Sequence, residues 1–171
     1  MRRRPPALPT TPIVPGPGQE SVWDYPRPPR VERGDEHVVV RFGGQVVAET
    51  HDAVRVLETS HPPVYYLPRT AFAEGVVAEA SGSSVCEFKG TAGYLDLQVG
   101  DVVARRAAYY YPDPWSGYEE LGGRVAVYPG AMDSCEIDGE RVLPQEGGFY
   151  GGWITSRVVG PFKGAPGTLG W

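Results

Sequence analysis

Residues 37–49 read His-Val-Val-Val-Arg-Phe-Gly-Gly-Gln-Val-Val-Ala-Glu, and they carry the clearest secondary-structure signal in the chain. Two runs rich in valine flank the pair Gly43-Gly44. A tight hairpin turn needs positive φ at both central residues, and glycine adopts that conformation without a steric cost. The stretch therefore predicts a β-hairpin with strands over 37–42 and 45–49.

Further β signals follow this hairpin at intervals of about ten residues. They combine β-branched or aromatic residues with turn pairs such as Gly100-Asp101 and Asp138-Gly139. Short strands at this spacing are typical of sandwiches and small barrels, so we expect a mainly β protein. The expected strands are 54–58, 64–67, 85–89, 94–99, 102–111, 124–128 and 135–142.

Only one segment carries the signals of a helix. Asp113 can cap its start, Pro114 suits its first turn, and Gly122 can end it. The 171 residues include 23 glycines and 18 prolines, a share that disfavours long helices. We therefore expect one short helix over 113–122.

Proline and glycine divide the chain into three parts. Nine of the 18 prolines fall within residues 1–30, which predicts an extended or disordered arm, with ordered structure starting near Val31. A mainly β domain is expected over 31–143, and a glycine-rich, irregular wrap over 144–171 packs on it. No apolar run approaches the roughly 20 residues that span a bilayer, and residues 5–12 lack the apolar core of a signal peptide. These features predict a soluble, cytoplasmic protein.

The net charge of -5 is unevenly distributed along the chain. In residues 1–30, five arginines against Glu20 and Asp24 give +3, which leaves -8 on the remainder. An acidic body repels phosphate backbones, so specific nucleic-acid binding is not expected. The basic start, Arg2 to Arg4, is interpreted as a solvated arm. A protein partner and the oligomeric state stay open.

Histidine and cysteine do not form a recognisable metal motif. A closed zinc site usually builds on ligand pairs two to five positions apart, and His37, His51, His61, Cys86 and Cys135 contain no such pair. We therefore expect no metal and no cofactor. Both cysteines are expected to be reduced and to pack as small apolar residues, since two cysteines make no disulfide framework.

Several motifs, in order, resemble one family. The segment Glu58-Thr59-Ser60-His61-Pro62-Pro63-Val64-Tyr65-Tyr66-Leu67-Pro68 and the box Cys86-Glu87-Phe88-Lys89-Gly90-Thr91-Ala92-Gly93-Tyr94 resemble the signatures of domain of unknown function 427. Tyr111-Pro112-Asp113-Pro114 and Val127-Tyr128-Pro129, followed by Asp133, match two further marks, and the tail over 149–166 is similar to that of longer members. The resemblance covers about residues 21–166.

The resemblance implies a β-tent-like fold, in which two antiparallel sheets meet at an angle, similar to methionine sulfoxide reductase B and the thalidomide-binding domain of cereblon. Those relatives typically hold zinc through Cys-x-x-Cys pairs, which this sequence lacks. An older label of the family is a nucleotidyltransferase type. That reaction needs paired carboxylates on metal ions, whereas Asp96 and Asp101, like Asp133 and Asp138, straddle turns. The sequence therefore does not support nucleotidyl transfer.

Three polar residues are the candidates for catalysis. Glu58 ends an expected strand three residues before His61, and Lys89 precedes Gly90. A carboxylate, an imidazole and an ammonium that converge on one cleft could orient or protonate a small substrate. The alternative is an ion pair between Glu58 and Lys89 at a sheet corner. Cys86 is a possible nucleophile, but strand alternation favours its burial.

Tyrosines gather in the motif regions on both faces of the expected sheets. Adjacent residues of a strand, such as Tyr65 and Tyr66, point to opposite faces, whereas a core needs only one apolar face. One face is therefore expected to line a pocket for a small planar or cationic molecule. The alternatives are cross-strand packing and, for the whole protein, a non-catalytic protein-interaction module. The candidate ligand-binding residues are Tyr65, Tyr66, Tyr94, Tyr111, Asp113 and Tyr128.

Overall fold

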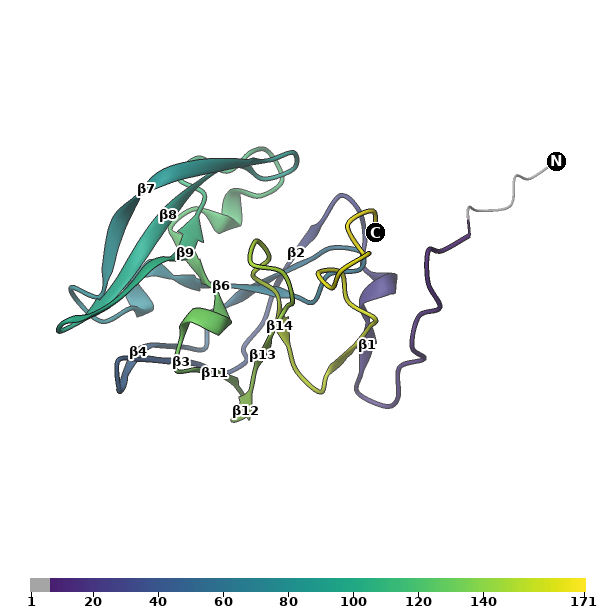
Figure 1. The fold of residues 1–171 in the computed structure, drawn as a ribbon, viewed down its shortest axis with the longest axis horizontal. Coiled ribbons are helices and arrows are strands. Elements are labelled where there is room, and N and C mark those ends of the chain that lie inside the picture. The colour runs from purple at the N-terminus through teal and green to yellow at the C-terminus, as the bar shows by residue number, and fades with distance from the viewer. Residues whose placement is uncertain (1–6) are drawn as a thin grey trace.

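The computed structural model describes residues 7–171, so the interpretation of Arg2 to Arg4 lies outside the described residues. The chain is mainly β, as predicted, and most of its strands form antiparallel sheets (Figure 1). The helical elements are 3-10 turns of three residues each, so within residues 7–171 no helix has the length to cross a membrane. These turns are η1 (Val22–Asp24), η2 (Arg69–Ala71), η3 (Glu119–Leu121) and η4 (Pro129–Ala131).

Two antiparallel sheets form the body of the protein. In their spatial order, the seven strands of the larger sheet are β2 (Arg30–Arg33), β5 (Val54–Leu57), β6 (Val64–Pro68), β10 (Arg124–Val127), β9 (Val102–Tyr110), β8 (Gly90–Val99) and β7 (Val77–Cys86). The four strands of the smaller sheet are β12 (Glu140–Arg141), β11 (Ser134–Ile137), β3 (Val38–Phe42) and β4 (Gln45–Thr50).

The predicted hairpin joins β3 and β4, and its turn has the expected geometry. Gly43 has a φ of 60° and Gly44 a φ of 77°. Gly43 also lies against the end of β8, because a Cβ placed there would be 2.7 Å from the Cβ of Val99. Position 43 therefore requires glycine, both for the conformation of the turn and for the close packing against Val99.

Two short strand pairs fasten the ends of the chain to this body. β1 (Glu20–Ser21) pairs in parallel with β15 (Val158–Val159), and β13 (Leu143–Pro144) pairs with β14 (Trp153–Ile154). In Figure 1, β1 and the C-terminal segment lie together at one end of the molecule. Packed structure thus begins before Val31, which corrects the expected starting point. The reason is a third apolar cluster, in which Val22, Tyr25, Leu57 and Val158 are buried together.

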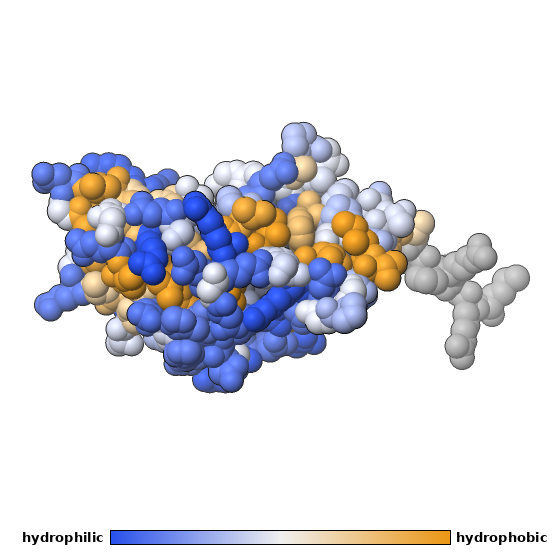
Figure 2. Space-filling view, turned by 90° about the horizontal axis from the view of Figure 1, so that it is seen from below, coloured by the Kyte–Doolittle hydropathy of each residue, from blue (hydrophilic) through white to orange (hydrophobic). Residues whose placement is uncertain are grey.

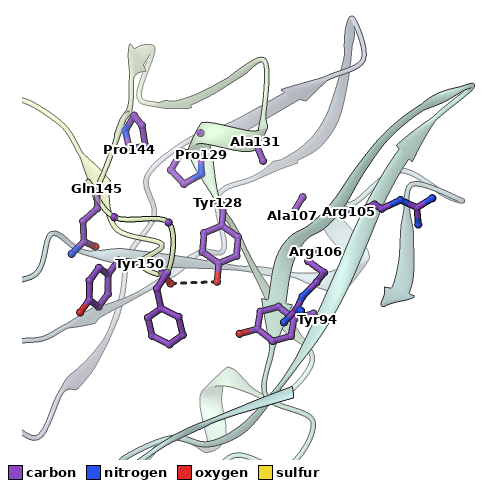
Figure 3. Close-up of a pocket in the computed structure, with 14 residues that line it drawn as sticks. Tyr94, Arg105, Arg106, Ala107, Tyr128, Pro129, Ala131, Pro144, Gln145 and Tyr150 are labelled. Atoms are coloured by element: carbon purple, nitrogen blue, oxygen red, sulfur yellow. Dashed lines mark hydrogen bonds between the residues drawn. The ribbon is translucent and has the colours of Figure 1, made fainter. Parts of the chain in front are cut away.

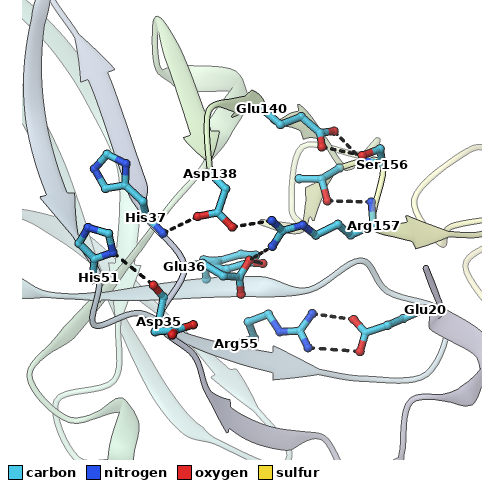
Figure 4. A network of polar contacts seen from close by, with 12 residues as sticks. Glu20, Asp35, Glu36, His37, His51, Arg55, Asp138, Glu140, Ser156 and Arg157 are labelled. Carbon is cyan, nitrogen blue, oxygen red and sulfur yellow. Dashed lines mark hydrogen bonds and ion pairs between the residues drawn. The ribbon is translucent and has the colours of Figure 1, made fainter. Parts of the chain in front are cut away.

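Charged side chains add to this attachment (Figure 4). Arg157, next to β15, pairs with Glu36 at 3.0 Å and also with Asp138. Glu36 in turn accepts a hydrogen bond from the Tyr65 hydroxyl at 2.9 Å. In β5, the Arg55 guanidinium lies 2.7 Å from the carboxylate of Glu20. These contacts hold the N- and C-terminal segments in place beside the larger sheet.

The main core lies between the two sheets, and a second core covers the opposite face of the larger sheet. Tyr65 and Leu67 of β6 belong to the main core, whereas Tyr66 between them belongs to the second. The predicted opposition of Tyr65 and Tyr66 is therefore confirmed. On the outer surface, Figure 2 shows a mostly hydrophilic face with separate apolar patches.

Two expected elements differ from the structure. The strand expected over 85–89 is wrong, because β7 runs from Val77 to Cys86 and residues 87–89 form the turn into β8. Much of β7 is exposed, so the strand contains serine, glycine and alanine and lacks the apolar run that would have indicated it. The expected helix over 113–122 is reduced to η3, which Asp113 does not cap. Pro114 and Gly117, which has a φ of 93°, interrupt the segment.

Candidate functional site

A cavity of about 240 Å³ opens beside the second core, where three loop segments meet strands β8 and β9. The three segments are the loop after β5, the turn between β7 and β8, and the segment after β13. The predicted site residues that line this cavity are Glu58, His61, Lys89, Tyr94, Tyr111 and Tyr128. The structure thus brings together all three polar candidates and three of the five candidate tyrosines.

The other candidates lie elsewhere. Tyr65 belongs to the main core, and Tyr66 is buried on the opposite face behind the cavity wall. Asp113 is exposed to solvent and does not line the cavity. Strand alternation cannot place a cavity on its own, because a side chain on the correct face can still be sealed beneath its neighbours.

A tight turn over residues 58–61 positions Glu58 and His61. The His61 N–H donates to the Glu58 carbonyl at 3.0 Å, and Ser60 between them has a φ of 72°. The N-terminal segment holds this turn, since Arg27 donates to the Thr59 carbonyl at 2.9 Å. Because of the turn, the Glu58 carboxylate lies 3.5 Å from Nε2 of His61, and it also lies 3.5 Å from the guanidinium of Arg27.

Gln145 sets the hydrogen-bonding state of His61. The side-chain oxygen of Gln145, Oε1, accepts a hydrogen bond from the Gly152 N–H at 3.1 Å. The side-chain nitrogen of Gln145, Nε2, is therefore the donor. It donates to the Lys163 carbonyl at 2.7 Å and to Nδ1 of His61 at 3.2 Å. Nδ1 is then an acceptor, and the ring proton sits on Nε2, facing Glu58. Burial lowers the pKa of His61 to about 4, and the charge of Lys163 adds to the shift. His61 is therefore neutral near pH 7.

Both lysines of the chain line this one cavity. The Lys89 Nζ lies 5.7 Å from the ring centre of Tyr111, and the Lys163 Nζ lies 5.8 Å from that of Tyr150. Lys163 also donates to the Trp171 carbonyl at 3.1 Å. Two ammonium groups near aromatic rings therefore give the cavity cationic donors, and the Glu58 carboxylate lines the same cavity.

Phenol rings form one wall of the cavity. The Tyr109 ring centre lies 5.2 Å from that of Tyr128 and 6.4 Å from that of Tyr111, and Tyr66 packs behind them. Burial raises the pKa of Tyr109 well above its ordinary value and that of Tyr128 to about 12. These tyrosines are therefore neutral phenols, which offer ring faces and hydroxyl hydrogen bonds but no phenolate.

Small residues of the 86–94 box make room for aromatic side chains. A Cβ at Gly90 would lie 3.0 Å from the indole of Trp115, and one at Gly93 would lie 2.8 Å from the Tyr110 ring. The two glycines therefore let aromatic rings lie directly against the β8 backbone. This close packing gives the box a structural reason for its pattern, in addition to the Lys89 side chain that it supplies.

Comparison with known families identifies these motifs. The family model described as domain of unknown function (DUF427) matches residues 30–138. The chain belongs to the DUF427 family. No curated protein matches the chain.

The DUF427 match covers only part of the cavity wall. Tyr150, Lys163 and Gln145 follow the matched residues, and Arg27, which pairs with Glu58, precedes them. Sequence reasoning missed Gln145 and Lys163 as site residues. The composition could have indicated Lys163, because the chain contains only two lysines and the other one, Lys89, was a candidate site residue.

Tyr109 and Cys86 are among the further residues of the DUF427 match that line the cavity. Tyr109 shares a strand face with Tyr111, so the same alternation pointed to it. Cys86 is half-buried at the cavity wall, whereas Cys135 is buried in the main core, where burial raises its pKa to about 12. Among residues 7–171, no group of three or more His, Cys, Asp or Glu side chains is placed to hold a metal ion.

Proposed function

We propose that this DUF427 protein binds a small planar molecule in the 240 Å³ cavity. One observation carries the proposal: Glu58 and His61 of one turn and Lys89 of a distant segment line one hollow beside the Tyr109 and Tyr111 rings. A corner that served only as an ion pair would need no such hollow. Convergent polar groups in an aromatic cavity are the usual form of a small-molecule site.

The volume of the cavity limits the size of the ligand. An engineered protein cavity of about 150 Å³ holds benzene, and a water molecule occupies about 30 Å³ in the liquid. A cavity of 240 Å³ therefore has room for a planar group of one ring or of two fused rings. It lies just below the range of about 300–1,000 Å³ that is common for drug-sized ligands.

The charges of the lining support a planar ligand more than a cationic one. Lys89 and Lys163 both face the cavity, and the Glu58 carboxylate is already shared with Arg27. A cationic ligand would meet two ammonium groups, whereas the face of a neutral ring can stack on a tyrosine.

The same polar groups support acid–base chemistry as an extension of the proposal. The Glu58 carboxylate accepts a proton, the Lys89 ammonium donates one, and the neutral His61 offers its Nε2–H as a fixed donor. In this arrangement Gln145 prevents the imidazole from turning, because it engages Nδ1.

A thermal-shift screen against a library of single-ring metabolites tests the proposal. A ligand that binds only the folded chain raises the midpoint of unfolding. Glu58→Gln and Lys89→Met should abolish the shift while the ligand-free midpoint stays within a few degrees. Glu74→Gln, an exposed change away from the cavity, is the matched control and should keep the shift. Hits that bind both cavity variants as well as the wild-type chain contradict the proposal.

A protein-interaction module is the second candidate. It is favoured by Val85 and Phe149, which line the cavity mouth and are 68% and 67% exposed. Large exposed apolar side chains at one place mark contact surfaces. In that case Phe149→Ser should abolish binding to a protein partner, and no small molecule should shift the midpoint.

A further inference from the structure

A second hollow lies directly beside the cavity and shares part of its wall. This groove has a volume of about 650 Å³ and runs past the end of β10 and the glycine-rich segment 147–150 (Figure 3). Five residues line both hollows, namely Tyr94, Tyr128, Gln145, Phe149 and Tyr150. The two hollows are therefore neighbouring compartments, and one ligand of sufficient length can occupy both.

The partition between the compartments is weakly held. The Tyr128 hydroxyl donates to the Phe149 carbonyl across a long contact of 3.4 Å. The Phe149 ring is 67% exposed, and the residues just before it are Gly147 and Gly148. Phe149 thus lines both hollows from a glycine-rich segment, and its contact with Tyr128 is long.

Arg106 gives the groove a fixed positive charge. Its guanidinium lies 4.2 Å from the ring centre of Tyr94, which lines both compartments. In Figure 3 the Arg106 side chain reaches toward Tyr94, whereas Arg105, which also lines the groove, extends away from Tyr94. Among residues 7–171, Arg106 makes no salt bridge with a carboxylate. Its charge is therefore open to a ligand.

The backbone is distorted where it presents this side chain. Arg106 has a φ of 50°, at an irregularity in the pairing of β8 with β9, and its N–H donates to the Asp96 carboxylate at 2.7 Å. On β7, which lies beyond β8 in the sheet, a Cβ at Gly82 would lie 3.2 Å from the guanidinium. A non-glycine residue at positive φ carries a cost in free energy, and such residues cluster at ligand sites. Here the distortion turns the two consecutive arginines apart and lays Arg106 on Tyr94.

We propose that the ligand is a planar molecule that carries a carboxylate or a phosphate, with its ring in the cavity and its anionic group at Arg106 in the groove. This inference rests on the proposed function and adds the chemical class of the ligand. Arginine is suited to this role because its planar fork of donors matches the oxygens of both groups. Lys89 and Lys163 add positive charge along the same path.

A matched set of indoles tests the charge requirement. Indole-3-acetate is anionic with a planar ring, tryptophol is its neutral counterpart, and tryptamine is its cationic counterpart. A fourth compound, 1-naphthyl phosphate, carries a phosphate on a fused ring of similar size. Binding to the full chain is measured by isothermal titration calorimetry or by shifts of amide signals in NMR spectra. We expect at least one of the two anions to bind about tenfold more tightly than tryptophol, and tryptamine to bind most weakly.

Two variants assign the preference to one residue. Arg106→Gln should reduce the affinity for the anion to that for tryptophol and leave the affinity for tryptophol unchanged. Arg30→Gln removes the same charge from an exposed position that lines neither hollow and should preserve the preference. Raising the salt concentration should weaken the preference in the wild-type chain but not alter tryptophol binding, because salt screens an exposed charge.

The failures of the two proposals give different results. Equal binding of anionic and neutral indoles, or a preference that survives Arg106→Gln, overturns the anionic class while the cavity proposal stands. If none of the four compounds binds, the anionic class is overturned, and if the wider screen also yields no ligand, the cavity proposal falls with it.

Discussion

Gln145 Nε2 lies 3.2 Å from Nδ1 of His61, and this contact joins the C-terminal segment to the turn that holds Glu58. The same amide also donates a hydrogen bond to the Lys163 carbonyl and accepts one from the Gly152 N–H. One buried side chain therefore orients the histidine and fixes two stretches of the C-terminal segment, at Gly152 and at Lys163. The site depends on residues more than 80 positions apart, since His61 and Gln145 are separated by 84.

Removing this amide should destabilise the protein and disturb the site. Gln145→Ala leaves the Lys163 carbonyl, the Gly152 N–H and Nδ1 of His61 without their partner, which we expect to cost about 2 kcal/mol. Urea unfolding followed by tryptophan fluorescence measures this loss. Gln98→Ala, which removes an exposed amide bonded only to the Gly100 carbonyl, is the control and should cost about 0.5 kcal/mol or less. Equal losses for the two variants contradict the assigned role of Gln145.

Acid should weaken the fold through His61. The pKa of His61 is about 4 in the folded chain and 6.5 in its ordinary state, so between these values the unfolded chain binds a proton that the folded chain does not. The free energy of unfolding is therefore highest above pH 6.5 and falls as the pH drops toward 4, by on the order of 3 kcal/mol at most. Urea unfolding at a series of pH values measures this slope.

Histidine variants separate this effect from other titrations. His61→Gln should flatten the decline between pH 6.5 and pH 4, whereas His51→Gln, at an exposed position, should leave it unchanged. The same decline in the wild-type chain and in His61→Gln would show that other groups cause it.

Glycine at position 60 should stabilise the chain. Ser60 has a φ of 72°, and its buried hydroxyl has no hydrogen-bond partner among the described residues. Ser60→Gly relieves the backbone strain and removes the unpaired hydroxyl, which together outweigh the greater freedom of glycine in the unfolded chain. We expect a gain of about 1 kcal/mol in urea unfolding. Ser60→Ala, which keeps the strain, should gain less, and a loss of stability in Ser60→Gly would contradict this interpretation.

Two glycines of the C-terminal segment should respond differently to alanine. A Cβ at Gly152 would lie 2.4 Å from the Gln145 amide oxygen and 2.5 Å from Pro62, whereas nothing lies within 4 Å of a Cβ at Gly148. Gly152→Ala should therefore destabilise by about 2–3 kcal/mol, because both neighbours are buried and must shift. Gly148→Ala should change the free energy of unfolding by less than about 0.5 kcal/mol. Thermal unfolding of both variants compares them directly.

Local signals in the sequence were sufficient for many elements of the fold. The Gly43-Gly44 pair predicted its hairpin because positive φ at two consecutive residues has few other uses. β7 was missed except at its end, because a strand at the sheet edge with much of its surface exposed needs no apolar pattern. The helix expected from Asp113 failed because capping signals do not compensate for Pro114 and Gly117 within the segment.

The candidate site could be predicted only in part for a similar reason. Glu58, His61 and Lys89 are polar residues at strand ends, and such positions stand out in a sequence. Gln145 and Lys163 lie in an irregular segment whose path depends on tertiary contacts, so no periodicity could place them. The burial of Tyr65 and Tyr66 depends on what covers each face of β6, which alternation alone does not reveal.

The most direct test of the central claim is a crystal structure of the chain after soaking with single-ring fragments. The account predicts electron density for a planar fragment in the 240 Å³ cavity, within contact of Tyr111 and Lys89. The account would be contradicted if the fragments bound only at other surfaces and the cavity stayed empty at every fragment concentration, with the Lys89 side chain occupying it.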